Sequence, residues 1–184
     1  MNIFLKWQND KTSGGKQLLF LVVGALLFPI SIPAILVFFL PRLDKLIGIG
    51  SFYYGSISIV VGILAIILGC FIAFSTILAQ VKFASGTPFP MMPTKKLLVI
   101  GPFKYCRNPM TLGTILAYSG IALMVGSYSS LLFVVIFFLI LLTYLMLIEE
   151  KELELRFGQE YLDYKNNTPF IIPIRFITGK GTNK

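Results

Sequence analysis

The chain has 184 residues, of which 56% are hydrophobic and only 13% are charged, with a net charge of +8 and no histidine. Soluble domains carry about 25% charged residues, so this composition predicts an all-α integral membrane protein with little mass outside the bilayer. The lack of histidine excludes a histidine-based metal site and a serine–histidine triad, and we expect no bound metal. The cations flank apolar runs, which favours membrane lipid over nucleic acid as their partner.

The first uncharged run covers residues 17–40, which is long enough to span a hydrocarbon core of about 30 Å. It lacks a small-residue cleavage site, so we expect a retained membrane span rather than a signal peptide. Pro29 and Pro33 should kink this helix or break its second half, and Pro41 should end it. A short loop should follow at the charged residues Arg42, Asp44 and Lys45.

The second uncharged run predicts a helix over about residues 53–81, after an irregular piece at residues 48–51. Its small residues allow neighbouring helices to approach closely. They are Gly55, Ser56, Ser58, Gly62 and Gly69. We therefore expect a close helix–helix contact along this span.

A proline-rich loop at residues 82–109 carries five cations and no acid. At its end Asn108 predicts a helix N-cap, and Pro109 takes the first helical position, where its missing N–H costs nothing. The uncharged run that follows, residues 110–148, is too long for one span. A tight turn predicted at residues 126–129 divides it into a hairpin. Its two spans cover about residues 110–126 and 130–148.

From residue 149 the pattern becomes amphipathic. Apolar residues recur at three- and four-residue steps, which is the pattern of one helical face. They are Leu153, Phe157, Tyr161 and Tyr164. Gly158 should weaken this helix, and Thr168-Pro169 should end it. We therefore expect a C-terminal amphipathic helix over residues 149–166 at the membrane interface.

All but two of the 16 lysine and arginine residues fall in three segments: residues 1–16, the loop at 82–109 and the chain after residue 148. By the positive-inside rule these segments face the cytoplasm. We therefore expect about four membrane spans, with both termini in the cytoplasm. Arg107 and the Glu149-Glu150 pair then lie at the cytoplasmic face.

The hairpin should bring Arg107 together with Glu149 and Glu150. The arginine precedes the first hairpin helix and the glutamates follow the second, so all three charges should meet at one membrane edge. Polar groups this close to hydrocarbon are costly and tend to be functional. Glu150 also shares the apolar face of Leu153 and Phe157. Two plainer interpretations stay open: an ion pair that staples the hairpin, and an arginine that snorkels to lipid headgroups.

An arginine and two glutamates beside a helix N-terminus suit a zwitterionic nucleoside cofactor. Arg107 and the helix N-terminus can bind a carboxylate, and a glutamate can accept hydrogen bonds from ribose hydroxyls or an ammonium group. Aromatic residues near both ends of the hairpin can pack against adenine or a sulfonium. They are Phe103, Tyr105, Tyr144 and Phe157.

Five short motifs follow one another in the second half of the chain. They are Gly101-Pro102-Phe103, Arg107-Asn108-Pro109, Glu149-Glu150, Phe157-Gly158-Gln159-Glu160-Tyr161 and Pro169. In this order they resemble the isoprenylcysteine carboxyl methyltransferase and phospholipid methyltransferase families, over residues 82–173. Gly86-Thr87-Pro88 is similar to the bacterial members, which implies a bacterial inner membrane.

The resemblance implies a small multi-span enzyme that uses S-adenosylmethionine to methylate a lipophilic or small-molecule acceptor. With the chemistry above, it implies that Glu150 and Arg107 are catalytic. The cofactor-binding residues expected are Gly101, Pro102, Phe103, Tyr105, Arg107, Asn108, Pro109, Tyr144, Glu149, Glu150, Phe157 and Tyr161. The carboxyl methyltransferases have His where this chain has Asn108 and commonly Tyr where it has Thr111, which weighs against a prenylated protein as the acceptor.

Two other functional classes stay open at this point. A membrane reductase of the sterol-reductase type is similar in its C-terminal part, but it binds NADPH and commonly has more spans. A non-catalytic membrane module would use Arg107 and the glutamates only to hold the fold. Titration with S-adenosylhomocysteine and with NADPH separates the three classes.

Overall fold

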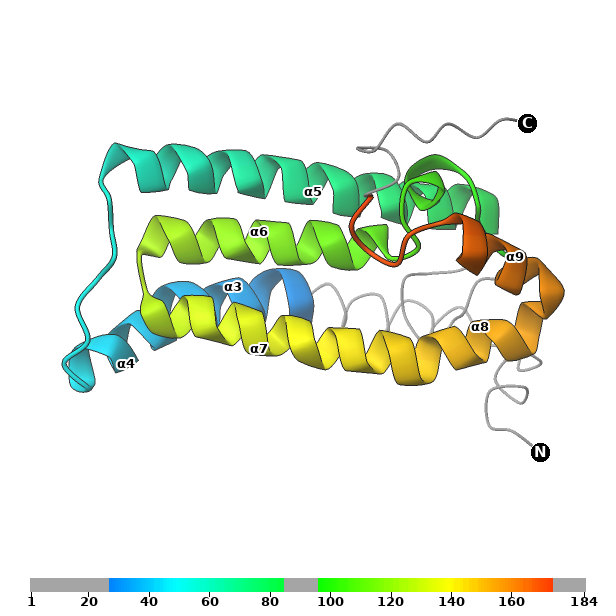
Figure 1. The fold of residues 1–184 in the computed structure, drawn as a ribbon. Helices are drawn as coiled ribbons and strands as arrows, with labels where there is room; N and C mark the ends of the chain where they lie inside the picture. The colour runs from blue at the N-terminus through cyan, green and yellow to red at the C-terminus, as the bar shows by residue number, and fades with distance from the viewer. Residues whose placement is uncertain (1–26, 85–95, 174–184) are drawn as a thin grey trace, which may run out of the picture. The chain divides into compact units, whose positions relative to one another are not determined.

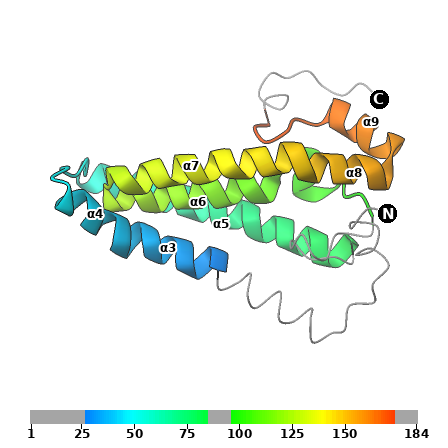
Figure 2. The same cartoon turned by 90° about the horizontal axis from the view of Figure 1, so that it is seen from below.

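The computed structural model describes residues 27–84 and 96–173, and every regular element among them is helical (Figures 1 and 2). The expected all-α fold is confirmed for this part of the chain. The elements are η1 (Leu27–Ser31), α3 (Ile32–Ala34), η2 (Ile35–Phe39), α4 (Leu40–Leu46), α5 (Ser56–Ala84), η3 (Gly101–Lys104), α6 (Pro109–Val125), α7 (Tyr128–Tyr144), η4 (Leu145–Glu149), α8 (Glu150–Phe157) and α9 (Gln159–Asn167). Three of them, η1, η2 and η4, are short π-helices, and η3 is a short 3-10 helix.

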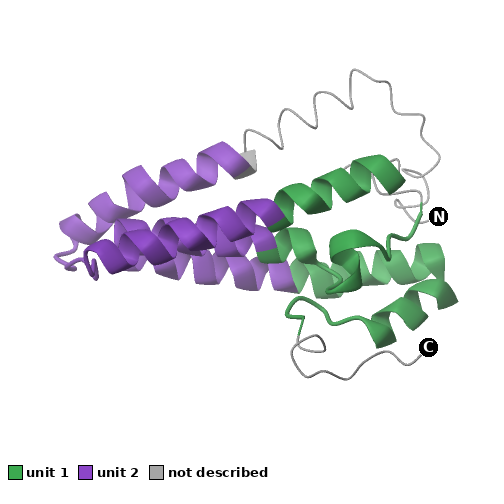
Figure 3. Ribbon diagram, turned by 90° about the horizontal axis from the view of Figure 1, so that it is seen from above, with its two compact units in different colours: residues 1–9, 72–112, 143–184 green, residues 10–71, 113–142 purple. Residues whose placement is uncertain are grey.

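The chain divides into two compact units, which are coloured separately in Figure 3. Of the described residues, unit 1 contains 72–84, 96–112 and 143–173, and unit 2 contains 27–71 and 113–142. All residues predicted to form the site belong to unit 1. Unit 2 contains a hydrophobic core shared by helices.

Two described helical stretches, Ser56–Phe83 and Tyr128–Phe157, are long and apolar enough to cross a membrane by length and composition. The apolar helix α6 has 17 residues, a length of about 25 Å against a hydrocarbon core of about 30 Å. The span expected at residues 17–40 begins outside the described residues. These helices indicate a membrane-associated protein, and the expectation of about four spans stays a prediction.

The sequence predicted that the first helix ends at Pro41, but the described helix continues past this residue. Helical residues continue without interruption from Leu27 to Leu46, through Pro29 and Pro33 as well. The charged residues predicted as a loop therefore lie in α4: Arg42, Asp44 and Lys45. The predicted helix end and loop are wrong because a residue far along the chain replaces the hydrogen bond that the proline removes.

This replacement follows from the π geometry before Pro41. In η2 the N–H of Leu40 donates to the carbonyl of Ile35, five residues back. The same pattern would pair residue 41 with the carbonyl of Leu36, but proline has no N–H to donate. The hydroxyl of Ser130 in α7 donates to that carbonyl instead, at 2.8 Å. With its carbonyl satisfied, the helix continues through the proline.

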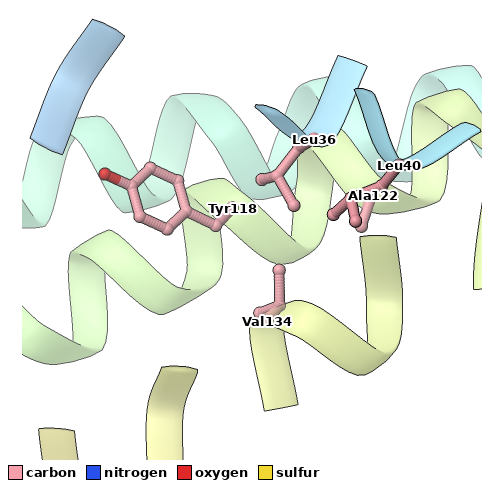
Figure 4. Packing of buried hydrophobic residues seen from close by; sticks show 5 residues of the cluster. All are labelled: Leu36, Leu40, Tyr118, Ala122 and Val134. Atoms are coloured by element: carbon pink, nitrogen blue, oxygen red, sulfur yellow. The ribbon is translucent and has the colours of Figure 1, made fainter. Parts of the chain in front are cut away.

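Within unit 2, α5 and α6 approach each other at backbone distance. A Cβ added to Gly69 would lie 2.5 Å from the carbonyl oxygen of Gly113, and one added to Gly62 would lie 2.7 Å from that of Gly120. Only a hydrogen atom fits there, so the predicted close contact through small residues is confirmed at these two glycines. The hydrophobic core of unit 2 joins η2, α4, α6 and α7 (Figure 4). Its buried residues are Leu36, Leu40, Tyr118, Ala122 and Val134.

The tight turn predicted at residues 126–129 connects α6 to α7. Gly126 has a φ of +66°, a conformation that glycine adopts without strain. Its carbonyl accepts hydrogen bonds from the N–H of Phe52 at 3.0 Å and the hydroxyl of Ser51 at 2.9 Å. The turn is therefore fixed by the irregular segment that precedes α5.

A carboxylate from α4 caps the start of α7. Asp44, which is 4% exposed, accepts hydrogen bonds from the hydroxyl of Ser127 at 2.6 Å and the backbone N–H of Ser129 at 3.1 Å. The hydroxyl of Ser129 also donates to it. Burial alone would raise the pKa of Asp44, but these hydrogen bonds outweigh burial and the pKa lies below its usual value. We call these three residues the Asp44 cluster.

The C-terminal segment forms two helices rather than the single amphipathic helix expected over residues 149–166. The helical stretch that includes α7, η4 and α8 ends at Phe157, and Gly158 then adopts φ +52° and ψ −127°. Figure 1 shows α9 changing direction after α8. Because a right-handed helix needs a negative φ at every residue, Gly158 divides the expected apolar face. Leu153 and Phe157 belong to α8, and Tyr161 and Tyr164 belong to α9.

Candidate functional site

The residues that lead into α6 are arranged by the 3-10 turn η3. Gly101 opens it with a φ of +60°, and the carbonyl of Pro102 accepts a hydrogen bond from the N–H of Tyr105 at 3.1 Å. The next helix, α6, begins at Pro109, as the sequence predicted. Arg107 and Asn108 are thereby placed immediately before a helix N-terminus.

The chain that follows α9 forms hydrogen bonds with these two residues. The backbone N–H of Arg107 donates to the carbonyl of Pro169 at 2.9 Å. Its Nε donates to the carbonyl of Thr168 at 3.1 Å. The backbone N–H and the side-chain amide of Asn108 both donate to the carbonyl of Phe170, each at 3.1 Å. A neutral imidazole N–H at position 108 can serve the same carbonyl, so asparagine keeps the donor that a histidine would supply.

Arg107 and Glu150 form an ion pair in unit 1, so these two residues meet as the hairpin predicted. Nη1 of Arg107 donates to Oε1 of Glu150, and the two side chains are only 11% and 13% exposed. The other oxygen, Oε2, accepts from Nζ of Lys165 at 2.8 Å, and the same ammonium donates to Glu154 at 2.7 Å. These hydrogen bonds raise the pKa of Lys165. We call Arg107, Glu150, Glu154 and Lys165 the Glu150 cluster.

Aromatic side chains contact the arginine of this cluster. The hydroxyl of Tyr161, a residue only 1% exposed, accepts from Nη1 of Arg107 at 3.4 Å. Cζ of Arg107 lies 5.2 Å from the ring centroid of Phe170, within the range of a cation–π contact. The hydroxyl of Tyr164 donates to the carbonyl of Phe103 at 2.7 Å. Burial raises the pKa of both tyrosines, which are therefore neutral hydrogen-bonding groups at physiological pH.

The arrangement offers a partly buried guanidinium with hydrogen-bonding capacity left over. Nε and Nη1 of Arg107 are occupied, whereas no described residue accepts a hydrogen bond from Nη2. A guanidinium can bind a further carboxylate through such N–H groups. The thiol of Cys106 in the same unit is no nucleophile at neutral pH, because burial raises its pKa to about 11. The cluster therefore suits the binding of an anion or zwitterion.

Four of the predicted site residues have other surroundings: Tyr105, Tyr144, Glu149 and Phe157. Tyr105 is 50% exposed. The ring of Phe157 lies 5.0 Å from Cζ of Arg156, which pairs with Glu152 at 3.1 Å. Among the described residues, neither Tyr144 nor Glu149 forms a hydrogen bond or ion pair with the Glu150 cluster.

Sequence reasoning missed several residues that the structure brings to Arg107 and Glu150. They are Glu154, Lys165, Thr168 and Phe170. In one continuous helix Glu154 and Lys165 would be about 16 Å apart along the axis, too far for an ion pair. The break at Gly158 brings their charged atoms within 2.7 Å. Gly158 is the sequence signal for this return, although a glycine by itself predicts only a weak point in the helix.

A family model described as phospholipid methyltransferase matches residues 57–160, more than half of the chain. The matched segment includes Arg107, Glu150 and most of both long apolar helical stretches. No curated protein matches the chain. The family match confirms the resemblance that the five motifs indicated.

Proposed function

The chain belongs to the phospholipid methyltransferase family, and we propose on this premise that it transfers a methyl group from S-adenosylmethionine to a lipophilic acceptor. We further propose that the site faces the cytoplasm in a bacterial inner membrane, with about four spans and both termini inside. The observation that carries the proposal is the family match, because it includes the apolar helices together with the ion pair of Arg107 and Glu150. Apolar helices give a lipophilic acceptor direct access from the bilayer.

The residues near the start of α6 fit this cofactor in chemical type. Arg107 provides a guanidinium for the amino-acid carboxylate, and a glutamate can accept from the ammonium group or the ribose hydroxyls. When bound, S-adenosylmethionine supplies a methyl group on a positively charged sulfur, which needs no further activation. The other residues that we propose to line its site are Gly101, Pro102, Phe103, Tyr105, Asn108, Pro109, Tyr144, Glu149, Glu150, Phe157 and Tyr161.

In this proposal the side chains act by binding, orientation and proton transfer. Arg107 orients the carboxylate of the cofactor, and the apolar helices exclude water from the reacting groups. The sequence predicted a catalytic Glu150; because both of its oxygens accept hydrogen bonds from cations, the role that we propose for it in catalysis is to hold Arg107 in place. If the acceptor is an amine, Glu149 takes the proton that the amine loses, because neither cation of the cluster occupies its carboxylate.

The test is calorimetric titration of the purified protein in detergent with S-adenosylhomocysteine and, separately, with NADPH. Binding of S-adenosylhomocysteine alone is the expected result. Binding of NADPH alone would support a reductase of the sterol-reductase type, and binding of neither would support a non-catalytic membrane module. Labelled S-adenosylmethionine incubated with total membrane lipid then identifies the fraction that gains the methyl group.

The variant Arg107→Lys tests whether the guanidinium itself is needed. Loss of a charge-assisted pair costs about 1.5–3 kcal/mol, so affinity for S-adenosylhomocysteine should fall roughly tenfold to a hundredfold. Lysine cannot serve Glu150 and the carbonyl of Thr168 from one planar group. The control is Lys104→Gln, which removes an exposed cation from η3. Unchanged affinity in Arg107→Lys would support an arginine that only snorkels to headgroups.

The orientation is tested by cysteine labelling in intact cells, in a background without Cys70 and Cys106. A cysteine at Tyr128, which is 49% exposed, should react with an impermeant thiol reagent from outside. A cysteine at Glu160, exposed on α9, should react only after the cells are opened. The reverse pattern would overturn the cytoplasmic placement of the site.

A further inference from the structure

One ammonium group connects the two short helices that follow the apolar stretch. Lys165 on α9 donates to Glu150 at 2.8 Å and to Glu154 at 2.7 Å. The two carboxylates stand one helical turn apart on α8, so a single side chain fixes α9 against one face of α8. Gly158, with its φ of +52°, permits the reversal, and no atom lies within 4 Å of a Cβ added to it. Lys165 therefore links α9 directly to α8, in addition to the burial of Tyr161 and Tyr164 on α9.

The attachment determines what reaches Arg107. Three residues after Lys165, the carbonyl of Thr168 accepts from Nε of Arg107, and the next carbonyl accepts from its backbone N–H. Tyr161, one turn before Lys165 on α9, places its hydroxyl at Nη1. These partners occupy Nε and Nη1 and leave Nη2 without an acceptor among the described residues.

We infer that Lys165 is a positioning residue for the carboxylate-binding arginine. By clamping α9 to Glu150 and Glu154, it holds Tyr161 and Thr168 in the positions that orient Arg107. The N–H groups of Nη2 then stay available for a ligand carboxylate. This inference rests on the proposed function, since the ligand is the amino-acid end of the cofactor. Lys165 itself contacts carboxylates of the protein and needs no contact with the cofactor.

The test compares Lys165→Gln, Lys165→Arg and the control Lys151→Gln. Lys151 is exposed on α8, so its variant changes the net charge equally without touching the cluster. The first readout is amide hydrogen exchange in the cofactor-free protein, followed residue by residue. In Lys165→Gln the amides of Arg107 and Asn108 should exchange faster, because their acceptors follow α9, while the amide of Ser129 should be unchanged.

The second readout is the affinity for S-adenosylhomocysteine. Lys165→Gln should weaken it about two- to fivefold, as expected when the ion pairs of a one-third exposed side chain are lost. Turnover at saturating S-adenosylmethionine should fall by a smaller factor than the affinity, because Lys165 pairs with carboxylates of the protein. Lys165→Arg retains the charge and should restore most of the exchange protection and affinity. If Lys165→Gln fails to fold, Glu154→Gln replaces it, because that variant removes one of the two ion pairs of Lys165 and should give the same changes to a smaller extent.

The outcomes separate the clamp from the proposed function. Unchanged exchange at Arg107 and Asn108 in Lys165→Gln would overturn the clamp. Faster exchange with unchanged affinity would overturn the positioning role, as would an equal loss of affinity in Lys151→Gln. If the wild-type protein binds no S-adenosylhomocysteine, the proposed function fails and the positioning role fails with it, whereas the exchange data still report on the clamp alone.

Discussion

Asp44 in unit 2 and Glu150 in unit 1 are both carboxylates with little exposed surface, and their partners differ in kind. Asp44 accepts from two serine hydroxyls and a backbone N–H at the start of one helix. Glu150 accepts from Arg107, which lies 43 residues before it, and from Lys165 in the following helix, α9. The first carboxylate has neutral donors on short side chains, and the second has two cations on long ones.

This difference separates a structural carboxylate from one that can take part in binding. Backbone and serine donors at a helix N-terminus are fixed by the helix and serve no other acceptor without unfolding it. Arginine and lysine side chains carry several N–H groups and can serve a second anion while they keep the first. The Asp44 cluster therefore maintains the fold, whereas the Glu150 cluster has the capacity to bind a ligand.

The largest effect is expected for Glu150→Gln, which removes the charge partner of Arg107 and one of the two charge partners of Lys165. Removing one member of a buried ion pair costs about 3–5 kcal/mol, and we expect the lower end because the side chain is still 13% exposed. Affinity for S-adenosylhomocysteine should fall more than in Glu149→Gln, whose carboxylate pairs with neither cation. Thermal melts and calorimetry in detergent measure both quantities. A weaker ligand affinity in Glu149→Gln than in Glu150→Gln would reverse the assignment.

Asp44→Asn should cost about 1–3 kcal/mol, because the amide replaces an acceptor with a donor opposite donors that cannot turn away. Unlike the substitution at Glu150, it should leave the affinity for S-adenosylhomocysteine unchanged. Denaturant unfolding and titration of the same preparation test the contrast. A loss of affinity equal to that of Glu150→Gln would mean that the two carboxylates do not have separate functions.

Gly158→Ala and Gly55→Ala form a matched pair in units 1 and 2. Both glycines have positive φ, +52° and +63°, and no atom lies within 4 Å of an added Cβ. Backbone strain should therefore cost each variant about 1–2 kcal/mol. Only Gly158→Ala should also weaken S-adenosylhomocysteine binding, because only that turn returns α9 to Arg107. Equal weakening in Gly55→Ala would show that lost stability alone reduces binding.

The smallest effects are expected at the extremes of pH, where the two clusters should weaken at opposite ends. The pKa of Asp44 is lowered from 3.8, so its stabilisation is present above that pH and is lost as the pH falls through the folded-state pKa. The pKa of Lys165 is raised from 10.5, so its stabilisation is complete below that pH and is lost as the pH rises through the folded-state pKa. With Lys165 one-third exposed, we expect about 0.5–1 kcal/mol for its share.

Melting temperatures across the pH range test this prediction. The advantage of the wild type over Asp44→Asn should disappear in acid and persist in alkali, whereas its advantage over Lys165→Gln should disappear in alkali. A common pH dependence for the two advantages would contradict it.

Local sequence determined several features of this protein. Asn108-Pro109 set the start of α6, Gly126 set the turn into α7, and the glycines of α5 set the close contact with α6. The short turn between α6 and α7 also made Arg107 and Glu150 meet, because a hairpin joins the residue before its first helix to the residue after its second. Each of these inferences depends on neighbours in sequence or on one short connection.

Tertiary structure alone decided the rest. The helix passes through Pro41 because the hydroxyl of Ser130, distant in sequence, donates to the carbonyl of Leu36 the hydrogen bond that proline, without an N–H, cannot donate. Lys165 reaches Glu150 because Gly158 reverses the chain and three carbonyls after α9 pair with Arg107 and Asn108. A sequence pattern records propensity and spacing, whereas these outcomes depend on which distant group satisfies a buried donor or acceptor, and that requires the folded chain.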